Sequence, residues 1–411
     1  MAALMLGIDF SKTDMQISLW NEERTRAEIY NFTGTSAGEV IPTMIITDED
    51  GNFLTAKAAL DYSMKTQKPG VTSLYGNFST EPVELGTQKM TIVELFAAYL
   101  QSVLGAVRKR YGGAPIAKIG ITGERMTEQH REHLIEVMKF LGYEEERLFF
   151  PTHADAFLWY ELYESAGSNV SMTLDFDSKG VQSYLLTPED AQKGFPAHIT
   201  TVDYSELMSG NLASVLDEEE RAKCFSNITE VALARKKIST LYVTGAFVEN
   251  PEINRVLQTL SDEDRRIFAG RGLYCLGACW NAVKEKLPKN TIGDRRIFHN
   301  VYLDAYQDAK DGPVLLMKAG TRLLYATSRV QVILDETLEL KFQVEDVRNN
   351  TSIVCTFRPD NLWPRENKTI RFEVEVKFLD YETLVLKVRD IGFGEIYPAT
   401  FRVWEQMIHL V

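Results

Sequence analysis

Two aspartates far apart in the chain each follow a short apolar strand and precede a polar turn. Asp9 lies in residues 6–13 and Asp175 in residues 173–180, and each turn leads into a segment that alternates apolar and polar residues. Both segments therefore predict a β-hairpin with an aspartate near its tip. A carboxylate in this position can hold a hydrated Mg²⁺ ion, while the amides of the turn donate to phosphate oxygens. Two such hairpins facing each other predict a nucleotide held from two sides.

The residues of the two turns complete this candidate site. We expect Asp9 and Asp175 to be the catalytic residues and to bind Mg²⁺ through water. The cofactor would be ATP or ADP with Mg²⁺, and its candidate contacts are Ser11, Lys12 and Thr13 in the first turn and Ser178, Lys179 and Gly180 in the second. The alternative is that each aspartate only caps its turn by accepting backbone N–H bonds. Asp177 is interpreted as such a turn residue.

Other polar residues suggest less chemistry. His130, His133 and His153 form no recognisable triad, because the first two lie three apart on one predicted helix, and we expect all three on the surface. Cys275 and Cys279 lie four apart in a predicted helix rich in small residues. Packing is the favoured interpretation for this pair, because no third metal ligand is nearby.

Composition excludes several classes of protein. A chain of 411 residues predicts two or three domains, and its net charge of −13 argues against a nucleic-acid partner, which needs a basic face. We expect no membrane partner, because no run of about eighteen apolar residues occurs. Residues 1–6 lack the basic start of a signal peptide. The four cysteines lack a paired framework, which favours a reducing, cytoplasmic location.

The elements that would position the two aspartates alternate between strands and helices. Helices are predicted over residues 56–64, 91–111, 127–141 and 152–165, then over 218–234, 250–260 and 269–286; Thr91 and Glu94 predict a capping box. Both halves follow the order hairpin, helix, strand, helix, which indicates a duplicated α/β fold with its ligand between two lobes. We place the first lobe at 1–165 and a reduced second lobe at 166–290.

The pattern changes near residues 288–293. Residues 294–411 contain short alternating strands separated by polar turns, which predict an antiparallel β-sandwich. The predicted strands are residues 314–317, 329–334, 338–344, 353–357, 371–378 and 383–388. Trp363, in a loop of this domain, is a candidate contact for a peptide or a cover for one end of the sandwich.

The order of these segments, with their local residues, resembles the DnaK-type chaperones, the seventy-kilodalton heat-shock family of the actin-like ATPase superfamily. Residues 7–13 and 174–186 resemble the two phosphate loops of that family, and residues 151–156 are similar to its Pro-Thr-Ala-Ala-Ala turn. Residues 241–246 resemble its adenosine loop, which adds Gly245 and Ala246 to the expected cofactor-binding residues. The resemblance implies a two-lobed actin-like ATPase fold with ribonuclease H-like duplicated lobes, followed by a β-sandwich similar to a chaperone peptide-binding domain.

Several departures from the family change the expected activity. The two turns contain few of the glycines that let amides approach phosphates. Phe150 stands where the family has a glutamate, and Leu74 and Tyr75 stand where it has a lysine. Those groups position water and stabilise phosphate charge, so any ATP hydrolysis is expected to be slow or absent. Lys12 or Lys179 is a candidate replacement for the lysine.

Two further differences concern size. Only 70 positions separate Asp175 from Gly245 (245 − 175), fewer than in the family, so part of the purine clamp is expected to be missing. The helical lid of the family is also expected to be missing. We expect weak nucleotide binding coupled to a β-domain that binds a peptide or protein client. One alternative is a non-catalytic pseudo-ATPase scaffold that mediates protein assembly, and another is a kinase of sugars or acetate from the same superfamily.

Overall fold

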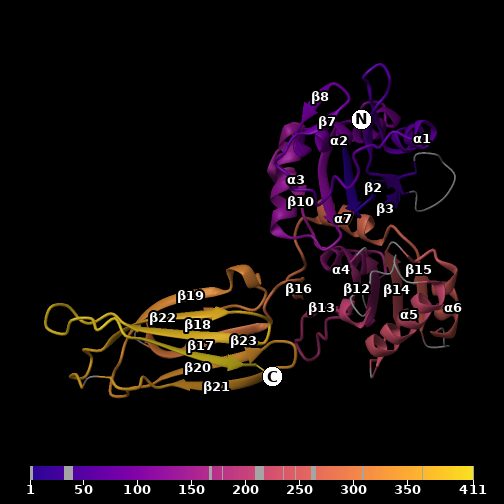
Figure 1. Cartoon of the computed structure of the whole chain (residues 1–411). Coiled ribbons are helices and arrows are strands. Elements are labelled where there is room, and N and C mark those ends of the chain that lie inside the picture. The colour runs from indigo at the N-terminus through magenta and orange to yellow at the C-terminus, as the bar shows by residue number, and fades with distance from the viewer. Residues whose placement is uncertain are drawn as a thin grey trace. The chain divides into compact units, whose positions relative to one another are not determined.

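The computed structural model divides the chain into two compact units (Figure 1). The first unit comprises Met1–Pro188 and Ile199–Leu287, and the second comprises Glu189–His198 and Pro288–Val411. The structure describes residues 3–31, 40–165, 169–177, 179–208, 217–234, 236–245, 247–260, 265–307, 310–362 and 364–410. Three residues singled out from the sequence, Ser178, Ala246 and Trp363, lie outside the described residues. Among the described helices, none is long and apolar enough to cross a membrane.

The first half of the first unit is built on a mixed sheet with the strand order β10-β9-β1-β2-β3. Strands β1, β2 and β3 form an antiparallel meander, and β9 and β10 continue the sheet in parallel with β1. The bounds are β1 (Leu4–Phe10), β2 (Asp14–Asn21), β3 (Arg26–Ile29), β9 (Ile116–Gly123) and β10 (Leu148–Phe149), with the short β4 (Ile41–Pro42) paired to β2. Two small hairpins lie outside this sheet: β5 (Ile45–Thr47) with β6 (Phe53–Thr55), and β7 (Val83–Leu85) with β8 (Gln88–Met90).

Four helices accompany this sheet: α1 (Ala56–Thr66), α2 (Ile92–Arg110), α3 (Glu128–Phe140) and α4 (His153–Tyr163). The capping box predicted for α2 is confirmed: Glu94 N donates to Thr91 Oγ1 at 3.2 Å, and Thr91 N donates to Glu94 Oε2 at 2.7 Å. The apolar stripe of α2 from Leu95 to Val107 is buried against the core. Local capping and period-3.6 patterning therefore act together in this helix.

The second half of the first unit repeats the plan of the first. Its sheet has the order β15-β14-β11-β12-β13, with β14 and β15 parallel to β11 and the return strand β12 antiparallel to it. The elements are β11 (Ser171–Asp177), β12 (Gly180–Thr187), β13 (Ala197–Asp203), α5 (Glu218–Leu233), β14 (Thr240–Gly245), α6 (Pro251–Leu260), β15 (Arg266–Ala269) and α7 (Leu273–Lys284). Apart from α1 and the short strands β4–β8, which are inserted in the first half, each half runs through three strands, then helix, strand, helix, strand and helix.

One boundary prediction in this half is wrong. The helix expected over residues 269–286 begins at Leu273, because Arg266–Ala269 forms the edge strand β15 beside β14. Gly272, at φ +97°, precedes the helix in the left-handed conformation that glycine adopts easily. The predicted helix therefore overlaps the edge strand at Ala269 and includes the residues that connect the strand to the true helix start.

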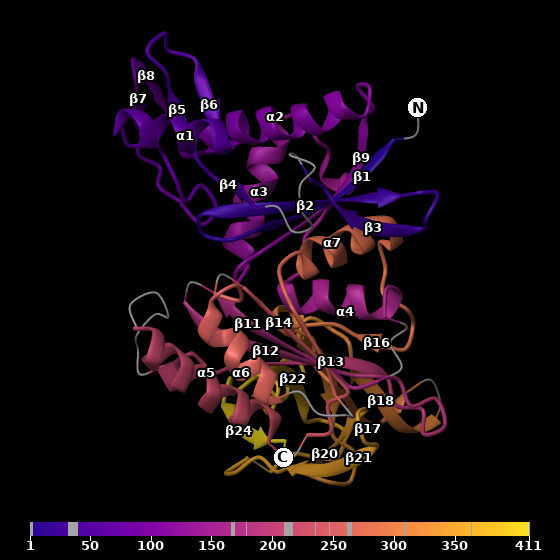
Figure 2. The same ribbon diagram turned by 90° about the vertical axis from the view of Figure 1, so that its right-hand side faces the viewer.

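The last helices of the two halves, α4 and α7, pack together between the two sheets (Figure 2). The two helices approach so closely at Gly277 that this position has no room for a side chain: a Cβ there would lie 1.8 Å from the carbonyl oxygen of Ala156. On the opposite side of α7, a Cβ at Gly7 would lie 1.9 Å from the carbonyl oxygen of Cys275. Helix α7 therefore lies directly on the first sheet, and the two halves share one closely packed seam.

The second unit consists of two four-stranded antiparallel sheets around a common core, with the orders β18-β17-β20-β21 and β19-β22-β23-β24. The bounds are β17 (His299–Gln307), β18 (Lys310–Met317), β19 (Thr327–Ile333), β20 (Leu340–Asp346), β21 (Thr351–Phe357), β22 (Arg371–Phe378), β23 (Thr383–Asp390) and β24 (Val403–His409). Fully buried side chains from both sheets, such as Phe342 and Phe372, fill the space between them. Alternating residues on each strand face this core.

Residues 189–198, which the sequence had placed inside the second lobe, group with the second unit. Asn290 Nδ2 donates to Glu189 Oε1 at 2.6 Å, and the ring of His198 meets that of Phe298 edge-on at 5.7 Å. The start of β13 pairs in parallel with β16 (Thr291–Ile292). These contacts join segments about a hundred residues apart, which no local pattern in the sequence indicates.

Candidate functional site

Asp9 and Asp175 occupy equivalent places in the two halves of the first unit. Each aspartate lies on the first strand of its sheet, opposite a glutamine on the antiparallel return strand and a threonine on the next parallel strand. The two triplets are Asp9, Gln16 and Thr122, and Asp175, Gln182 and Thr244. The two halves therefore repeat both the hairpin and the three side-chain types that lie opposite one another at its aspartate.

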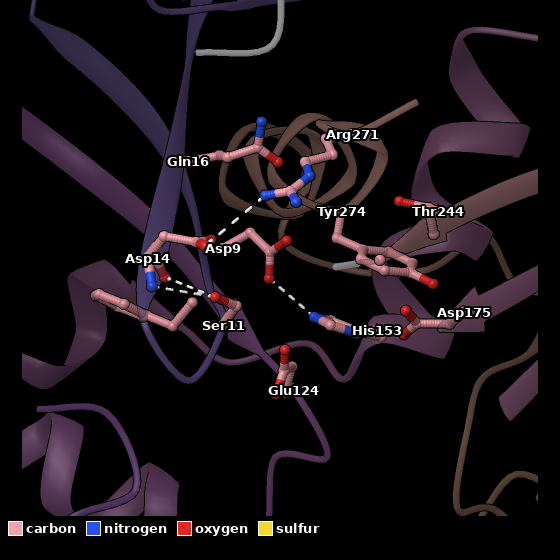
Figure 3. Close-up of a pocket in the computed structure, with 12 residues that line it drawn as sticks. Asp9, Ser11, Asp14, Gln16, Glu124, His153, Asp175, Thr244, Arg271 and Tyr274 are labelled. Atoms are coloured by element: carbon pink, nitrogen blue, oxygen red, sulfur yellow. Dashed lines mark hydrogen bonds and ion pairs between the residues drawn. The ribbon is translucent and has the colours of Figure 1, made fainter. Parts of the chain in front are cut away.

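Both aspartates line one small pocket of about 40 Å³ (Figure 3). Of the residues predicted from the sequence, the structure brings Asp9, Ser11, Asp175 and Gly245 to this pocket. The other lining residues are Phe10, Asp14, Gln16, Glu124, His153, Thr244, Arg271 and Tyr274. Typical small-molecule sites enclose roughly 300–1,000 Å³, so this pocket has room only for a few atoms.

The space between the two carboxylates is filled by His153, the first residue of α4. Its Nε2 lies 2.8 Å from Asp9 Oδ1, and its Nδ1 lies 2.9 Å from Asp175 Oδ2. The imidazole is 5% exposed and stacks on the ring of Tyr274 at a centroid distance of 3.8 Å. One side chain therefore connects the tips of the two hairpins, each ring nitrogen facing one aspartate.

The surroundings of His153 determine its charge. Burial disfavours the charged ring, but the negative charge of Asp9 and the hydrogen bonds to both carboxylates outweigh this and raise the pKa of His153 to about 10. At neutral pH the ring is therefore an imidazolium with an N–H on each nitrogen. Both N–H groups then donate to carboxylates, so both contacts are satisfied.

Two of the three histidines lie in the interior, contrary to the expectation from the sequence. His153 and His130 were expected on the surface, but they are 5% and 9% exposed. Thr152 caps the start of helix α4, where its hydroxyl accepts from Asp155 N at 3.2 Å, and the first residue of the helix, His153, points inward. A signal was present in the sequence: a histidine between Thr152 and Ala154, where the resembled turn has only small residues.

In the first turn, three backbone amides donate to acceptors within the turn itself. Ser11 N donates to the carbonyl oxygen of Asp14 at 2.8 Å, and Asp14 N and Thr13 N donate to Ser11 Oγ at 3.1 and 3.4 Å. Lys12 and Thr13 are exposed and do not line the pocket. These amides therefore satisfy the turn and are not directed at a ligand.

The second turn is closed in a similar way. Lys179 N donates to Asp177 Oδ1 at 2.7 Å, and the Lys179 side chain is exposed. Gly180 is required by packing, because a Cβ there would lie 2.1 Å from Ser205 Oγ. Gly245 also has a packing role, since its Cβ would lie 2.3 Å from the carbonyl oxygen of Phe176.

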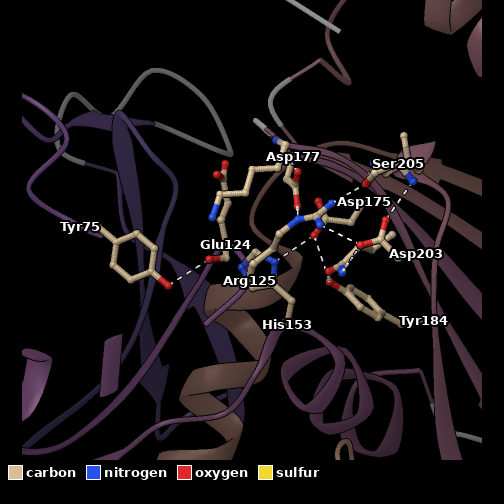
Figure 4. A network of polar contacts seen from close by, with 12 residues as sticks. Tyr75, Glu124, Arg125, His153, Asp175, Asp177, Tyr184, Asp203 and Ser205 are labelled. Atoms are coloured by element: carbon tan, nitrogen blue, oxygen red, sulfur yellow. Dashed lines mark hydrogen bonds and ion pairs between the residues drawn. The ribbon is translucent and has the colours of Figure 1, made fainter. Parts of the chain in front are cut away.

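A second polar link, which no pattern in the sequence indicates, joins the two halves beside the pocket (Figure 4). Arg125, in the loop after β9, donates from Nε to Asp177 Oδ2 at 2.5 Å, from Nη1 to Asp203 Oδ2 at 2.8 Å and from Nη2 to Ser205 Oγ at 2.8 Å. Arg125 adopts φ +48°, an uncommon conformation for this residue type. Asp177 is thus more than a turn residue, since it also accepts from this arginine.

The residues present fit Mg²⁺ with a nucleotide poorly. The position between the two carboxylates is taken by the imidazolium, and the amides of Ser11, Thr13, Asp14 and Lys179 donate to acceptors within the chain. Within the described ranges, no group of three or more His, Cys, Asp or Glu side chains is arranged to hold a metal ion. The site instead pairs acidic groups with cations that the chain itself supplies, His153 and Arg271.

Comparison with known proteins places most of the chain in a family. Residues 31–294 match DUF5716, described as a family of unknown function, C-terminal. Residues 296–410 match DUF8552, a domain of unknown function. No curated protein matches the chain. The first match ends seven residues (294 − 287) after Leu287, where the chain passes from the first compact unit to the second.

Proposed function

The chain belongs to the DUF5716 family, whose description assigns no function, and we propose a function from the geometry of the site. In this proposal the first unit is a non-catalytic, actin-like pseudo-ATPase, and the whole chain is a scaffold for protein assembly. In this proposal the lobes are held together by side chains of the protein. A nucleotide with its metal is not required to close them.

The duplicated architecture supports the first half of the proposal. Two mixed sheets have the same strand order, and the last helix of each half packs in the seam between them. Two hairpins bring equivalent aspartates to one pocket. This is the plan expected of an actin-like ATPase, in which two lobes grip the phosphates of a nucleotide.

The contact of His153 with both aspartates carries the second half of the proposal. In an active enzyme of this superfamily, hydrated Mg²⁺ would neutralise carboxylates in these positions. Here the imidazolium does so from 2.8 and 2.9 Å, and it is attached to the chain. A charge-assisted pair of this kind is strong when it is buried and both partners are satisfied. In this proposal the lobes stay closed without a nucleotide, as suits a scaffold.

The second unit supplies a surface for partners. The β-sandwich resembles the β half of a chaperone peptide-binding domain, and exposed strands of such a domain can pair with extended peptides. We propose that this unit binds a peptide or protein partner, while the first unit itself stays in one closed conformation.

Titration calorimetry with Mg-ATP tests the proposal. The natural chain should give no binding heat, whereas His153→Ala should expose the two carboxylates and gain measurable affinity for Mn²⁺, detected by loss of the free-ion signal in electron paramagnetic resonance. His133→Ala is the matched control, because His133 is a half-buried histidine of the same unit that does not line the pocket. Binding of Mg-ATP to the natural chain at micromolar concentration would overturn the pseudo-ATPase proposal.

A further inference from the structure

Strand β21 forms one free edge of the sheet β18-β17-β20-β21 (Figure 1). Its side chains are exposed on both faces: Ile353 is 38% exposed and Val354 is 69% exposed. Ile353 pairs with Val344 on β20, which is only 2% exposed. An apolar side chain on the core-facing side of β21 is therefore left partly uncovered, although its neighbour on the next strand is buried.

The composition of β21 differs from that of the other three edge strands of this unit. Free edges are normally protected by charge, proline or irregularity. Strand β18 contains Lys310 and Pro313 and has a register shift, β19 contains Arg329, and β24 contains Glu405. The seven residues of β21, Thr-Ser-Ile-Val-Cys-Thr-Phe, include no charge, proline or glycine. Such an edge favours pairing with another strand.

We propose that β21 pairs with β21 of a second copy of this chain, antiparallel about a twofold axis at Val354. A twofold register opposes residues whose numbers sum to 708, twice 354. Val354 then meets Val354, and Ile353 meets Cys355, so apolar side chains lie opposite apolar side chains. Ser352 meets Thr356, a hydroxyl pair that is favourable across strands. The segment is therefore complementary to itself, which is what a twofold interface requires.

The faces of the strand agree with this register. Ile353 and Cys355 pair with the core-facing Val344 and Phe342, whereas Ser352, Val354 and Thr356 point to the opposite face. In the twofold arrangement each residue meets one from its own face. The two sheets continue into one sheet of eight strands, and Cys355 of the second copy lies beside the partly uncovered Ile353. No charged residue of either strand is brought against another.

Because β21 has no charged residue, a basic or acidic peptide would find no opposite charge on it, whereas the uncharged β21 of a second copy needs none. The seam is a single strand pair, so the dimer belongs among the small and reversible interfaces. The proposal does not depend on the state of the cleft in the first unit, because β21 lies in the other compact unit.

Disulfide trapping tests the register directly. In a directly opposed antiparallel pair the two Cα atoms lie about 4.5 or 5.5 Å apart, within the span of a disulfide. Val354→Cys should therefore form a covalent dimer on mild oxidation. Ser352→Cys is the matched control: it lies on the same face of the same strand, but its counterpart is four residues away along the seam. The proposal is overturned if both variants, or neither, cross-link faster than the natural chain.

Analytical ultracentrifugation of the full chain gives a second, independent readout. The natural chain should associate to a dimer as its concentration rises, and Val354→Lys should raise the dissociation constant about tenfold or more, because two ammonium groups would meet at the axis. Val354 is exposed, so this change should leave the thermal unfolding midpoint nearly unaltered. A natural chain that stays monomeric, or a dimer that is insensitive to Val354→Lys, contradicts the proposal.

Discussion

The Nε2 atom of His153 lies 2.8 Å from Oδ1 of Asp9, although 144 residues separate the two in the chain. The contact joins the start of a helix to the tip of a hairpin from the same half of the unit. Its second partner, Asp175, comes from the other half, 2.9 Å from Nδ1. In the proposed actin-like plan, a side chain thus stands where an active ATPase would need a metal.

Replacing His153 by glutamine should destabilise the first unit. Glutamine has nearly the same reach but no charge, so Asp9 and Asp175 would lose the cation between them. Breaking a buried ion pair in this way costs about 3–5 kcal/mol. Urea unfolding, followed by circular dichroism, measures the difference. His133→Gln should cost much less, and equal losses for the two variants would contradict a bridging role for His153.

The contribution of His153 to stability should depend on pH. Burial opposes its charge, but the neighbouring carboxylates raise its pKa from 6.5 to about 10 in the folded chain. Stability from this group is therefore complete below pH 6.5 and is lost as the pH rises towards 10. The difference in unfolding free energy between the natural chain and His153→Gln should shrink over this range. A difference that stays constant from pH 6 to about pH 10 would contradict the imidazolium.

Arg125 should act as a second clamp between the halves. Removing it by Arg125→Met leaves Asp177 buried without its partner, a change that typically costs about 3–5 kcal/mol. Arg125→Lys keeps the charge but loses the fork that reaches Asp177, Asp203 and Ser205 together, so it should recover only part of the loss. Hydrogen exchange of the β11 and β12 amides should accelerate in Arg125→Met. Full recovery in the lysine variant would show that charge alone is sufficient.

The seam between α4 and α7 should tolerate no added atoms. Gly277→Ala would place a Cβ 1.8 Å from the carbonyl oxygen of Ala156, so the helices must separate. We expect a loss of about 1–3 kcal/mol, as for other overpacked sites. Gly105, in α2, is the matched control, because a Cβ there meets nothing within 4 Å. Gly105→Ala should stabilise the chain by about 0.4–1 kcal/mol. Thermal unfolding of both variants measures the contrast, and equal effects would contradict the close approach.

Asp390 should make the second unit sensitive to acid. It is fully buried and accepts from both Nη atoms of Arg365, at 3.0 and 2.7 Å, and from the Thr400 hydroxyl at 2.6 Å. Burial opposes its charge, but Arg365 and Thr400 lower the pKa of Asp390 from 3.8 to about 2. Its stabilisation, roughly 2 kcal/mol, is therefore present above pH 3.8 and is lost as the pH falls towards 2. Acid unfolding of the natural chain and Asp390→Asn should converge in that range. A gap that persists at pH 2 would show that the charge is not responsible.

The sequence was informative where structure is local. The capping box of Thr91 and Glu94 involves residues three apart, and the hairpins that carry Asp9 and Asp175 need only a strand, a turn and a return strand. It was uninformative where contacts join distant segments. Nothing near Arg125 in the chain indicates Asp203, and nothing near His153 indicates Asp9. His153 bridges two carboxylates only because the fold brings Asp175, from the other half of the unit, to the start of α4.

Nitrogen-15 nuclear magnetic resonance of the His153 ring, with a His153→Gln sample to assign the signal, tests the central claim most directly. The account predicts that at pH 8 both ring nitrogens carry a proton, that the ring loses one only near pH 10, and that Mg-ATP leaves both signals unchanged. A ring that is neutral at pH 8, or whose signals move on addition of Mg-ATP, would contradict it.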